Sequence, residues 1–208
     1  MDENRERILD AAEMQFMRLG IRSVSMDDVA REISISKKTL YQYFDNKDHL
    51  VSEVMQNHLE KERRDYDQIH EESENSIEEI HQISKCMRKH LSSVNPATLH
   101  DVKKYHVNAW AHFQEFKSGY IKERLMENLT SGIREGYYRA EMNPEILSIM
   151  RLEQVQLMFD PGIFPPQVYD AREVQIQLLD HFVHGLLTDK GRQLYQKFQI
   201  EEAKTHNS

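Results

Sequence analysis

Polar side chains that can form hydrogen bonds are concentrated in one short stretch near the N-terminus. They are Lys37, Lys38, Thr39, Gln42 and Tyr43. Ammonium groups bind phosphates, and amide and hydroxyl groups can bond to the edges of nucleic-acid bases. Between Ile33 and Phe44 the only charged residues are the two lysines, so a surface built from this stretch is locally positive. These residue types favour nucleic-acid binding over catalysis.

The residues just before this stretch predict two helices that could support it. Apolar residues recur at three- and four-residue steps from Arg5 to Leu19, and Gly20 follows as a helix stop because it tolerates positive φ. Ser25, with an acid at Asp28, has the pattern of a capping box and predicts the start of a short second helix.

A third helix is predicted from Lys37 to Phe44, with Ser36 as its cap. Leu40 and Phe44 lie four residues apart and are the expected inward anchors, which leaves the polar residues outward. Three short helices, the last two joined by a tight turn, describe a helix-turn-helix. A small packing unit with a solvated lysine pair is the alternative.

Two further groups in this region could bind a phosphate. Helix N-termini attract anions, so Ser25 and the backbone N–H groups behind it are candidates. Lys47 opens a fourth helix and could reach the same DNA backbone. It lies at the wrong end for the helix dipole, which favours a role outside its own helix.

The overall charge argues mildly against nucleic-acid binding. The chain has 208 residues and a formal net charge of −8, and residues 1–50 carry eight Lys/Arg against ten Asp/Glu. A basic domain is the usual footprint of a nucleic-acid-binding protein. The case for DNA therefore depends on the motif.

The first quarter of the chain resembles the N-terminal signature of the tetracycline-repressor (TetR) family. The matching residues are Ile8-Leu9-Asp10-Ala11-Ala12, Phe16, Gly20, Val29-Ala30, Ser36, Thr39-Leu40-Tyr41-Gln42-Tyr43-Phe44, Lys47 and Leu50. The Thr-Leu-Tyr-x-Tyr-Phe-x-x-Lys core is specific at this distance behind an Ala-Ala-x-x-x-Phe helix. The resemblance implies a dimeric all-α regulator, most often a repressor that a small molecule releases from DNA.

The resemblance also implies roles for single residues. It implies phosphate contacts from Ser25, Tyr41 and Lys47, and base or groove contacts from Lys37, Lys38, Thr39, Gln42 and Tyr43. Two positions depart from the pattern. Ile33-Ser34 stands where Ala-Gly is usual, which costs stability if the turn requires positive φ. Lys38 stands where a small residue or proline is common.

The rest of the chain is predicted to be helical. Glycine (7) and proline (5) are both scarce, which favours long helices. The sequence predicts an N-terminal helix-turn-helix domain at 1–50 and a helical-bundle body at 51–208 for ligand binding and dimerisation. The expected helices of the body lie at about 47–72, 77–94, 98–116, 121–137, 144–160 and 170–188, with a short last helix after Gly191 and a frayed end at 201–208.

The helix at 170–188 is apolar around roughly 220° of its circumference at about 100° per residue. It must therefore be central in its subunit or pack against a partner. We expect a two-fold homodimer in which this helix and the preceding one form a four-helix bundle. The expected interface residues are Val155, Leu178, Leu179, Phe182, Val183 and Leu186. Two recognition helices would then meet a near-palindromic double-stranded DNA operator.

Aromatic and methionine side chains suggest a pocket for a small apolar or amphipathic effector. Such residues often line apolar cavities, although they can equally fill a core. The candidates are Tyr105, Trp110, Phe113, Tyr120, Met126, Met150 and Phe159, with His106 or Asn108 as a polar contact.

Other functional classes find less support in the sequence. The eleven histidines form no His-Glu-x-x-His run, and nucleophile elbows and glycine-rich phosphate loops are absent, so we expect no metal, no cofactor and no enzyme activity. The single cysteine, Cys86, is expected to be a buried structural thiol. No apolar stretch suits a bilayer, so a cytoplasmic protein is expected. The alternatives are a DNA-binding regulator without small-molecule control and a helical-bundle metal-binding protein or enzyme.

Overall fold

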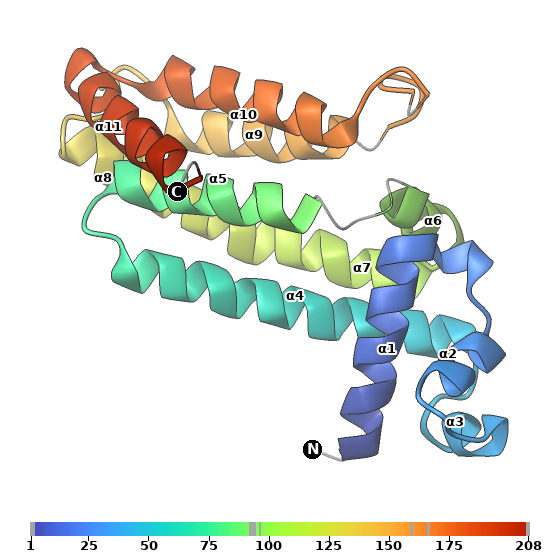
Figure 1. Ribbon diagram of the computed structural model, residues 1–208. Helices are drawn as coiled ribbons and strands as arrows, with labels where there is room; N and C mark the ends of the chain where they lie inside the picture. Colours follow the sequence, from blue (N-terminus) through green and yellow to red (C-terminus); the bar gives the residue numbers. More distant parts are fainter. Residues whose placement is uncertain (1–2, 92–94, 96, 159, 166, 207–208) are drawn as a thin grey trace. The chain divides into compact units, whose positions relative to one another are not determined.

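The computed structural model describes residues 3–91, 95, 97–158, 160–165 and 167–206. Within these residues every element is a helix, and an isolated bridge pairs Tyr138 with Leu187. The predicted all-α fold is confirmed. The elements, drawn in Figure 1, are α1 (Glu3–Leu19), η1 (Ile21–Ser23), α2 (Met26–Glu32), α3 (Lys37–Tyr43), α4 (Lys47–Glu72), α5 (Ser76–Leu91), α6 (Ala97–Tyr105), α7 (Val107–Phe116), η2 (Lys117–Ile121), α8 (Lys122–Arg134), α9 (Pro144–Leu157), α10 (Ala171–Leu186) and α11 (Asp189–His206).

The chain divides into two compact units whose bounds differ from a division at residue 50. The first unit comprises residues 1–64 and 93–118, and the second comprises residues 65–92 and 119–208. The first unit extends past the helix-turn-helix because α6 and α7 contribute Val102 and Ala109, both fully buried, to its core. A DNA-binding segment of residues 1–50 remains a prediction about function within this larger unit.

Residues of α1, α2, α3, α4, α6 and α7 together form the core of the first unit. Leu40 and Phe44 are 0% and 1% exposed, as expected for the anchors of the third helix. Two hydrogen bonds tie residues 93–118 to α1: the hydroxyl of Thr98 donates to the carbonyl of Phe16 at 3.2 Å, and the N–H of Asn95 donates to the carbonyl of Met17 at 2.6 Å. Residues of α6 and α7, far along the sequence from the helix-turn-helix, therefore share its core and support it.

The expected helix at 98–116 is interrupted at His106. Its φ of −127° and ψ of 72° end α6 and begin α7. The Nδ1 of His106 lies 2.8 Å from a carboxylate oxygen of Asp48 at the start of α4. The contact with Asp48 is made at the residue that separates α6 from α7, a break in the helix that the periodicity of the sequence did not predict.

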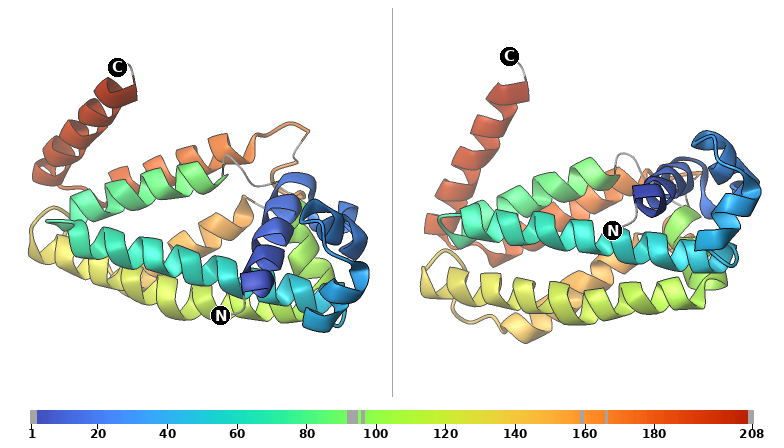
Figure 2. Two further views of the ribbon diagram at one scale, coloured as in Figure 1. Left: turned by 60° about the horizontal axis from the view of Figure 1, so that its bottom comes forward. Right: turned by 90° about the horizontal axis from the view of Figure 1, so that it is seen from below.

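The second unit is a bundle of the remaining helices. In this unit α5 packs against α8, α10 and α11, and α9 packs against α8 and α10. Figure 2 shows α11 running at a steep angle to α10. The core consists of residues such as Ile77, Leu129 and Val183, each 0% exposed.

Two glycines explain why the end of α8 and the start of α11 differ from the predicted helix boundaries. Gly136, with φ of 76°, ends the predicted 121–137 helix early, and α8 stops at Arg134. Gly191 does not precede the last helix but lies inside it. A Cβ on Gly191 would stand 2.2 Å from the carbonyl oxygen of Tyr137, so this position accepts only glycine. The predicted short last helix was wrong: α11 runs from Asp189 to His206.

Candidate nucleic-acid interface

The start of α2 has the predicted capping box. The hydroxyl of Ser25 accepts from the N–H of Asp28 at 3.2 Å, and the carboxylate of Asp28 accepts from the N–H of Ser25 at 2.9 Å. Hydrogen bonds from the Ser25 side chain and backbone lower the pKa of Asp28. A carboxylate therefore already stands beside the N–H groups that were expected to hold a phosphate. A phosphate contact from Ser25 stays a prediction.

The turn between α2 and α3 has the strain that its sequence implied. Ser34 has a φ of 58°, the one positive φ of a non-glycine residue in the described part of the chain. Its N–H donates to the carbonyl of Arg31 at 3.2 Å, and the next N–H, from Ile35, donates to the carbonyl of Ala30 at 3.0 Å. The turn that usually contains glycine is therefore made here by a residue with a Cβ.

The cap of α3 is also as predicted. The Ser36 hydroxyl accepts from the N–H of Thr39 at 3.0 Å, and the two hydroxyls lie 2.8 Å apart. Because Ser36 and Thr39 are hydrogen-bonded to each other, both side chains are held in place at the beginning of α3.

The outward face of α3 brings most of the candidate residues together. Lys37, Lys38, Tyr41 and Gln42 are exposed, and Thr39 and Tyr43 are half-buried. Tyr43 packs against the core of the first unit, beside Phe44. The inward anchors and the short length of α3 place four exposed polar side chains on one rigid surface.

The two lysines of α3 differ in their surroundings. The Nζ of Lys37 lies 2.8 Å from a carboxylate oxygen of Asp27 on α2 and 5.9 Å from the centroid of the Tyr41 ring. The hydrogen bond to Asp27 raises the pKa of Lys37. Lys38 has no ion pair within the part of the chain that the structure describes. Lys38 is therefore the cation that α3 presents without a counter-charge.

Lys47 makes a contact that the sequence did not reveal. Its Nζ donates to the carbonyl oxygen of Ile21 at 2.6 Å, which satisfies a main-chain group in η1. Burial lowers the pKa of Lys47, although the charges of Asp101 and Asp28 act in the opposite direction. Lys47 thus holds α4 to the segment after α1, and a phosphate contact by its other N–H groups stays a prediction.

The predicted effector residues that the structure describes belong to both units. Tyr105, His106, Trp110 and Phe113 belong to the first unit, whereas Tyr120, Met126 and Met150 belong to the second. Phe159 lies outside the described residues. In the first unit Trp110 and Phe113 stack with centroids 5.2 Å apart against the core. Tyr105 is 46% exposed, between Arg22 and Lys104.

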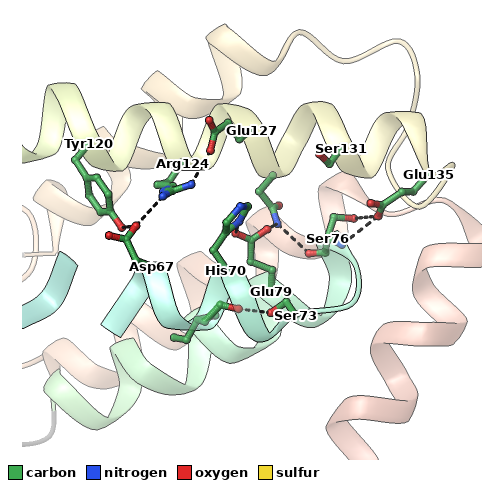
Figure 3. A network of polar contacts seen from close by, with 12 residues as sticks. Asp67, His70, Ser73, Ser76, Glu79, Tyr120, Arg124, Glu127, Ser131 and Glu135 are labelled. Carbon is green, nitrogen blue, oxygen red and sulfur yellow. Dashed lines mark hydrogen bonds and ion pairs between the residues drawn. The ribbon is translucent and has the colours of Figure 1, made fainter. Parts of the chain in front are cut away.

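In the second unit Tyr120 belongs to a polar network rather than to an apolar pocket (Figure 3). Its hydroxyl donates to Asp67 at 2.7 Å, and Arg124 donates to the same oxygen at 2.7 Å. Burial, followed by the bond to Asp67, raises the pKa of Tyr120 to about 12. Met150 is 42% exposed on α9.

The same network continues into the interior of the second unit. Asn128 donates to Glu79 at 2.6 Å and to the carbonyl of Ser76 at 3.0 Å, and Tyr138 donates to that carbonyl at 3.0 Å. Figure 3 labels Ser76 and Glu79 of this group on α5, beside α8. These polar groups satisfy one another's hydrogen bonds, so they stabilise the bundle.

A hollow of about 850 Å³ in the second unit is lined mainly by charged and polar residues of α4, α5, α10 and α11. Its lining residues include Glu72, Lys85, Cys86, Arg172 and Ile176. None of the predicted effector residues that the structure describes lines this hollow. Cys86 is half-buried here rather than buried as expected.

The predicted dimer residues are divided by their burial. Leu179, Phe182, Val183 and Leu186 are at most 6% exposed and belong to the core of the second unit. Val155 and Leu178 are half-buried. The wide apolar arc of α10 is therefore mostly covered within the subunit. Larger apolar residues are exposed on α9, namely Ile146, Ile149, Met150 and Leu157.

Two further features bear on the alternative functions. In the described ranges, no three residues of the His, Cys, Asp and Glu types come together as a metal would require. Over the same ranges, none of the helices has the length and apolar character needed to cross a membrane.

The comparisons with known proteins agree with this geometry. Residues 8–54 match bacterial regulatory proteins of the tetR family. The protein named "Uncharacterized HTH-type transcriptional regulator YvaF" from Bacillus subtilis (strain 168) is 26% identical over 171 residues, which cover 81% of this chain and 88% of that protein.

Solved structures share the whole fold at lower identity. A putative transcriptional regulator from Saccharomonospora viridis, in complex with choline, has a TM-score of 0.73 and 15% identity over 90% of this chain and 100% of its own. The regulator FadR from Bacillus subtilis, in complex with stearoyl-CoA, has a TM-score of 0.61 and 19% identity over 86% of this chain and 98% of its own. The family match falls on the segment that contains α2, the strained turn and α3.

Proposed function

The chain belongs to the tetR family of bacterial regulatory proteins and is a DNA-binding transcriptional regulator, and on that premise we propose that it is a cytoplasmic, dimeric repressor released from a near-palindromic operator by a small molecule. It acts by binding rather than by catalysis. The observation that carries the proposal is the face of α3, where Lys38, Tyr41 and Gln42 are exposed above the buried anchors Leu40 and Phe44.

The proposed division of labour on DNA follows the chemistry of the side chains. Gln42 and Lys38 read base edges, since an amide or an ammonium group can pair with purine acceptors in the major groove. Tyr41, Ser25 and Lys47 contact phosphates, and Lys37, Thr39, Tyr43 and Ser36 position α3 in the groove. Phosphate contacts fix the register of the protein, whereas base contacts specify the sequence.

We propose that the second copy packs on the outward face of α9. Ile149 and Met150 follow Ile146 by three and four residues on this face, and Leu157 continues it two turns later. Exposed apolar side chains in such a stripe mark an interaction surface. Leu178 on α10 is half-buried, and Val155, also half-buried, lies about 180° around α9 from Ile146, on the side away from the stripe. The two pairs of α9 and α10 would then form the four-helix bundle.

We place the effector in the second unit, because a ligand there can bias α4, which runs from the first unit into the second along the chain. Tyr120 and Met126 remain candidate contacts. Neighbours of the same fold have been solved with choline and with stearoyl-CoA, which supports small-molecule control in general but not either ligand for this chain. DNA and effector must then weaken each other's binding by the same factor.

The test is to select binding sites from random duplex DNA and to measure affinity for the selected operator by fluorescence anisotropy. Gln42→Ala and Lys38→Ala should change the selected sequence, and Tyr41→Ala should weaken binding to all sequences about equally. Gln68→Ala, on the part of α4 that belongs to the second unit, is the control and should leave both unchanged. A protein that selects no sequence and does not bind duplex DNA at low ionic strength would overturn the proposal.

A further inference from the structure

One arginine in the second unit is buried without a partner. Arg151 on α9 is 5% exposed, and neither Nη1 nor Nη2 has a hydrogen-bond partner within the described part of the chain. The guanidinium lies over the ring of Phe182 on α10, 5.7 Å from its centroid. The interior of the unit therefore contains a cation that faces an aromatic ring and no acid.

The partly buried arginines Arg88 and Arg124 of this unit each have the carboxylate partner that Arg151 lacks. Arg88 binds both carboxylate oxygens of Glu202, at 2.9 and 3.1 Å. Arg124 binds Asp67 at 2.7 Å and Glu127 at 3.0 Å. Burial lowers the pKa of Arg151 to about 10, and the hydroxyl of Tyr66 is the one group that acts against this. A buried, unpaired charge costs more free energy than a desolvated cation–π contact returns.

A second buried polar atom of this unit also has no partner. Gln175 on α10 is 0% exposed, and its Oε1 has no partner in the described residues. Gln175 and Phe182 are seven residues apart and share a face of α10, and α9 packs against α10. Leu152, Leu179 and Val183 on these helices are buried apolar residues. The Nε2 of Gln175 donates to the sulfur of Met87 on α5 at 3.9 Å, so its Oε1 is the atom left without a partner among buried apolar residues.

We infer that Arg151 binds the acidic head group of an amphipathic effector, a carboxylate or a phosphate, whose apolar chain packs among the side chains of α9 and α10. The inference rests on the proposed function, because it names the chemical class of the effector. A planar guanidinium forms two parallel hydrogen bonds to a carboxylate or phosphate, which neutral ligands cannot accept with the same strength. Gln175 supplies an amide for a further polar atom of the ligand.

The binding test uses the full chain and matched probes of one chain length at a time, from octyl to hexadecyl. Each set contains the fatty acid, the alkyl phosphate, the alcohol and the alkyltrimethylammonium, and calorimetry measures their affinities. We expect one of the two anions to bind at least about tenfold more tightly than the alcohol, in line with a charge-assisted hydrogen-bond pair. The preferred anion identifies the head group. Equal affinity for alcohol and anions, or no binding of any anion, would overturn the inference.

Substitutions connect the preference to one residue. Arg151→Met should reduce anion affinity at least about tenfold, leave alcohol affinity unchanged, and raise the melting temperature of the free protein because the unpaired charge is gone. Arg151→Lys should restore part of the anion preference. Arg139→Met, at an exposed arginine of the same unit, is the control for general charge effects. Anion binding that survives Arg151→Met would overturn the inference; if that variant does not fold, Arg151→Gln serves in its place.

Operator binding separates this inference from the proposed function. If the alcohol alone releases the operator, effector control stands and the acidic class is wrong. If the anions bind through Arg151 but no probe of any class changes operator affinity, the anion site stands and effector control by this site is wrong.

Discussion

The Nζ of Lys37 on α3 lies 2.8 Å from the carboxylate of Asp27 on α2. The sequence between Ile33 and Phe44 contains two lysines and no acid, yet an acid ten residues before Lys37 partly neutralises that surface. The helix-turn-helix therefore presents less positive charge to DNA than the local sequence suggests, and Lys38 supplies most of it.

Asp27→Asn should increase the affinity for DNA. Removal of the carboxylate frees Lys37 for a phosphate, so the affinity for operator and non-operator DNA should rise by about the same few-fold factor. The slope of log affinity against log salt should also steepen, by about one counterion per subunit. Asp10→Asn, which affects the pair with Lys61 on α4 instead, is the control and should change neither quantity. An unchanged salt slope would show that Lys37 does not reach the DNA.

Ser34→Gly should stabilise the first unit. Ser34 has a φ of 58°, where a Cβ is strained by roughly 1–2 kcal/mol, and glycine regains part of this after its larger loss of chain entropy. We expect a gain of about 0.5–1 kcal/mol in the free energy of unfolding, measured by urea denaturation. Ser34→Ala keeps the Cβ and should give no gain. Equal stability of both variants would argue that the turn is not strained.

Glu13→Gln should make the protein less sensitive to acid. Burial raises the pKa of Glu13, but hydrogen bonds from His58 at 2.7 Å and Lys61 at 2.9 Å outweigh it, and the pKa lies below its ordinary value. A carboxyl group with a lowered folded pKa contributes stability above its unfolded pKa, near 4.3, and loses it as pH falls through the folded value. At pH 7 we expect Glu13→Gln to cost about 1 kcal/mol, and the difference from wild type should shrink below about pH 4. Melting temperatures across this range test it; a difference that stays constant would contradict it.

Gly132→Ala should destabilise the protein even though alanine is the better helix former. A Cβ on Gly132 would stand 2.1 Å from the ring of Tyr138, which is 1% exposed and hydrogen-bonded to Asn128. The forced shift should cost about 3 kcal/mol. Gly119→Ala, where a Cβ would meet nothing within 4 Å, should instead gain about 0.5–1 kcal/mol. Thermal denaturation gives both signs, and a gain at both positions would refute the close approach.

Ile149→Glu should convert the dimer to monomer. Ile149 is 47% exposed on the outward face of α9, so a charge there is tolerated in one subunit but would be buried without a partner in the proposed interface. Sedimentation velocity measures the change, and operator affinity should fall with it. Val107→Glu, at a residue 73% exposed on α7, is the matched control and should leave the dimer intact. A dimer that survives Ile149→Glu would place the interface elsewhere.

The sequence alone was sufficient for the helix-turn-helix. The caps at Ser25 and Ser36, the anchors Leu40 and Phe44, and the strained turn at Ser34 all involve groups within a few residues of one another. Helix periodicity and capping chemistry act over that range, so the residues themselves reveal the local structure.

Only the tertiary structure decided which distant groups meet. The partners of Lys37, Lys47 and His106 lie 10, 26 and 58 residues away, and nothing in a helical period indicates them. The wide apolar arc of α10 could equally fit a core helix or an interface helix, and packing placed most of it in the core. The unpaired state of Arg151 is likewise invisible in sequence, because whether an acid stands beside a buried cation depends on how the helices of the bundle pack.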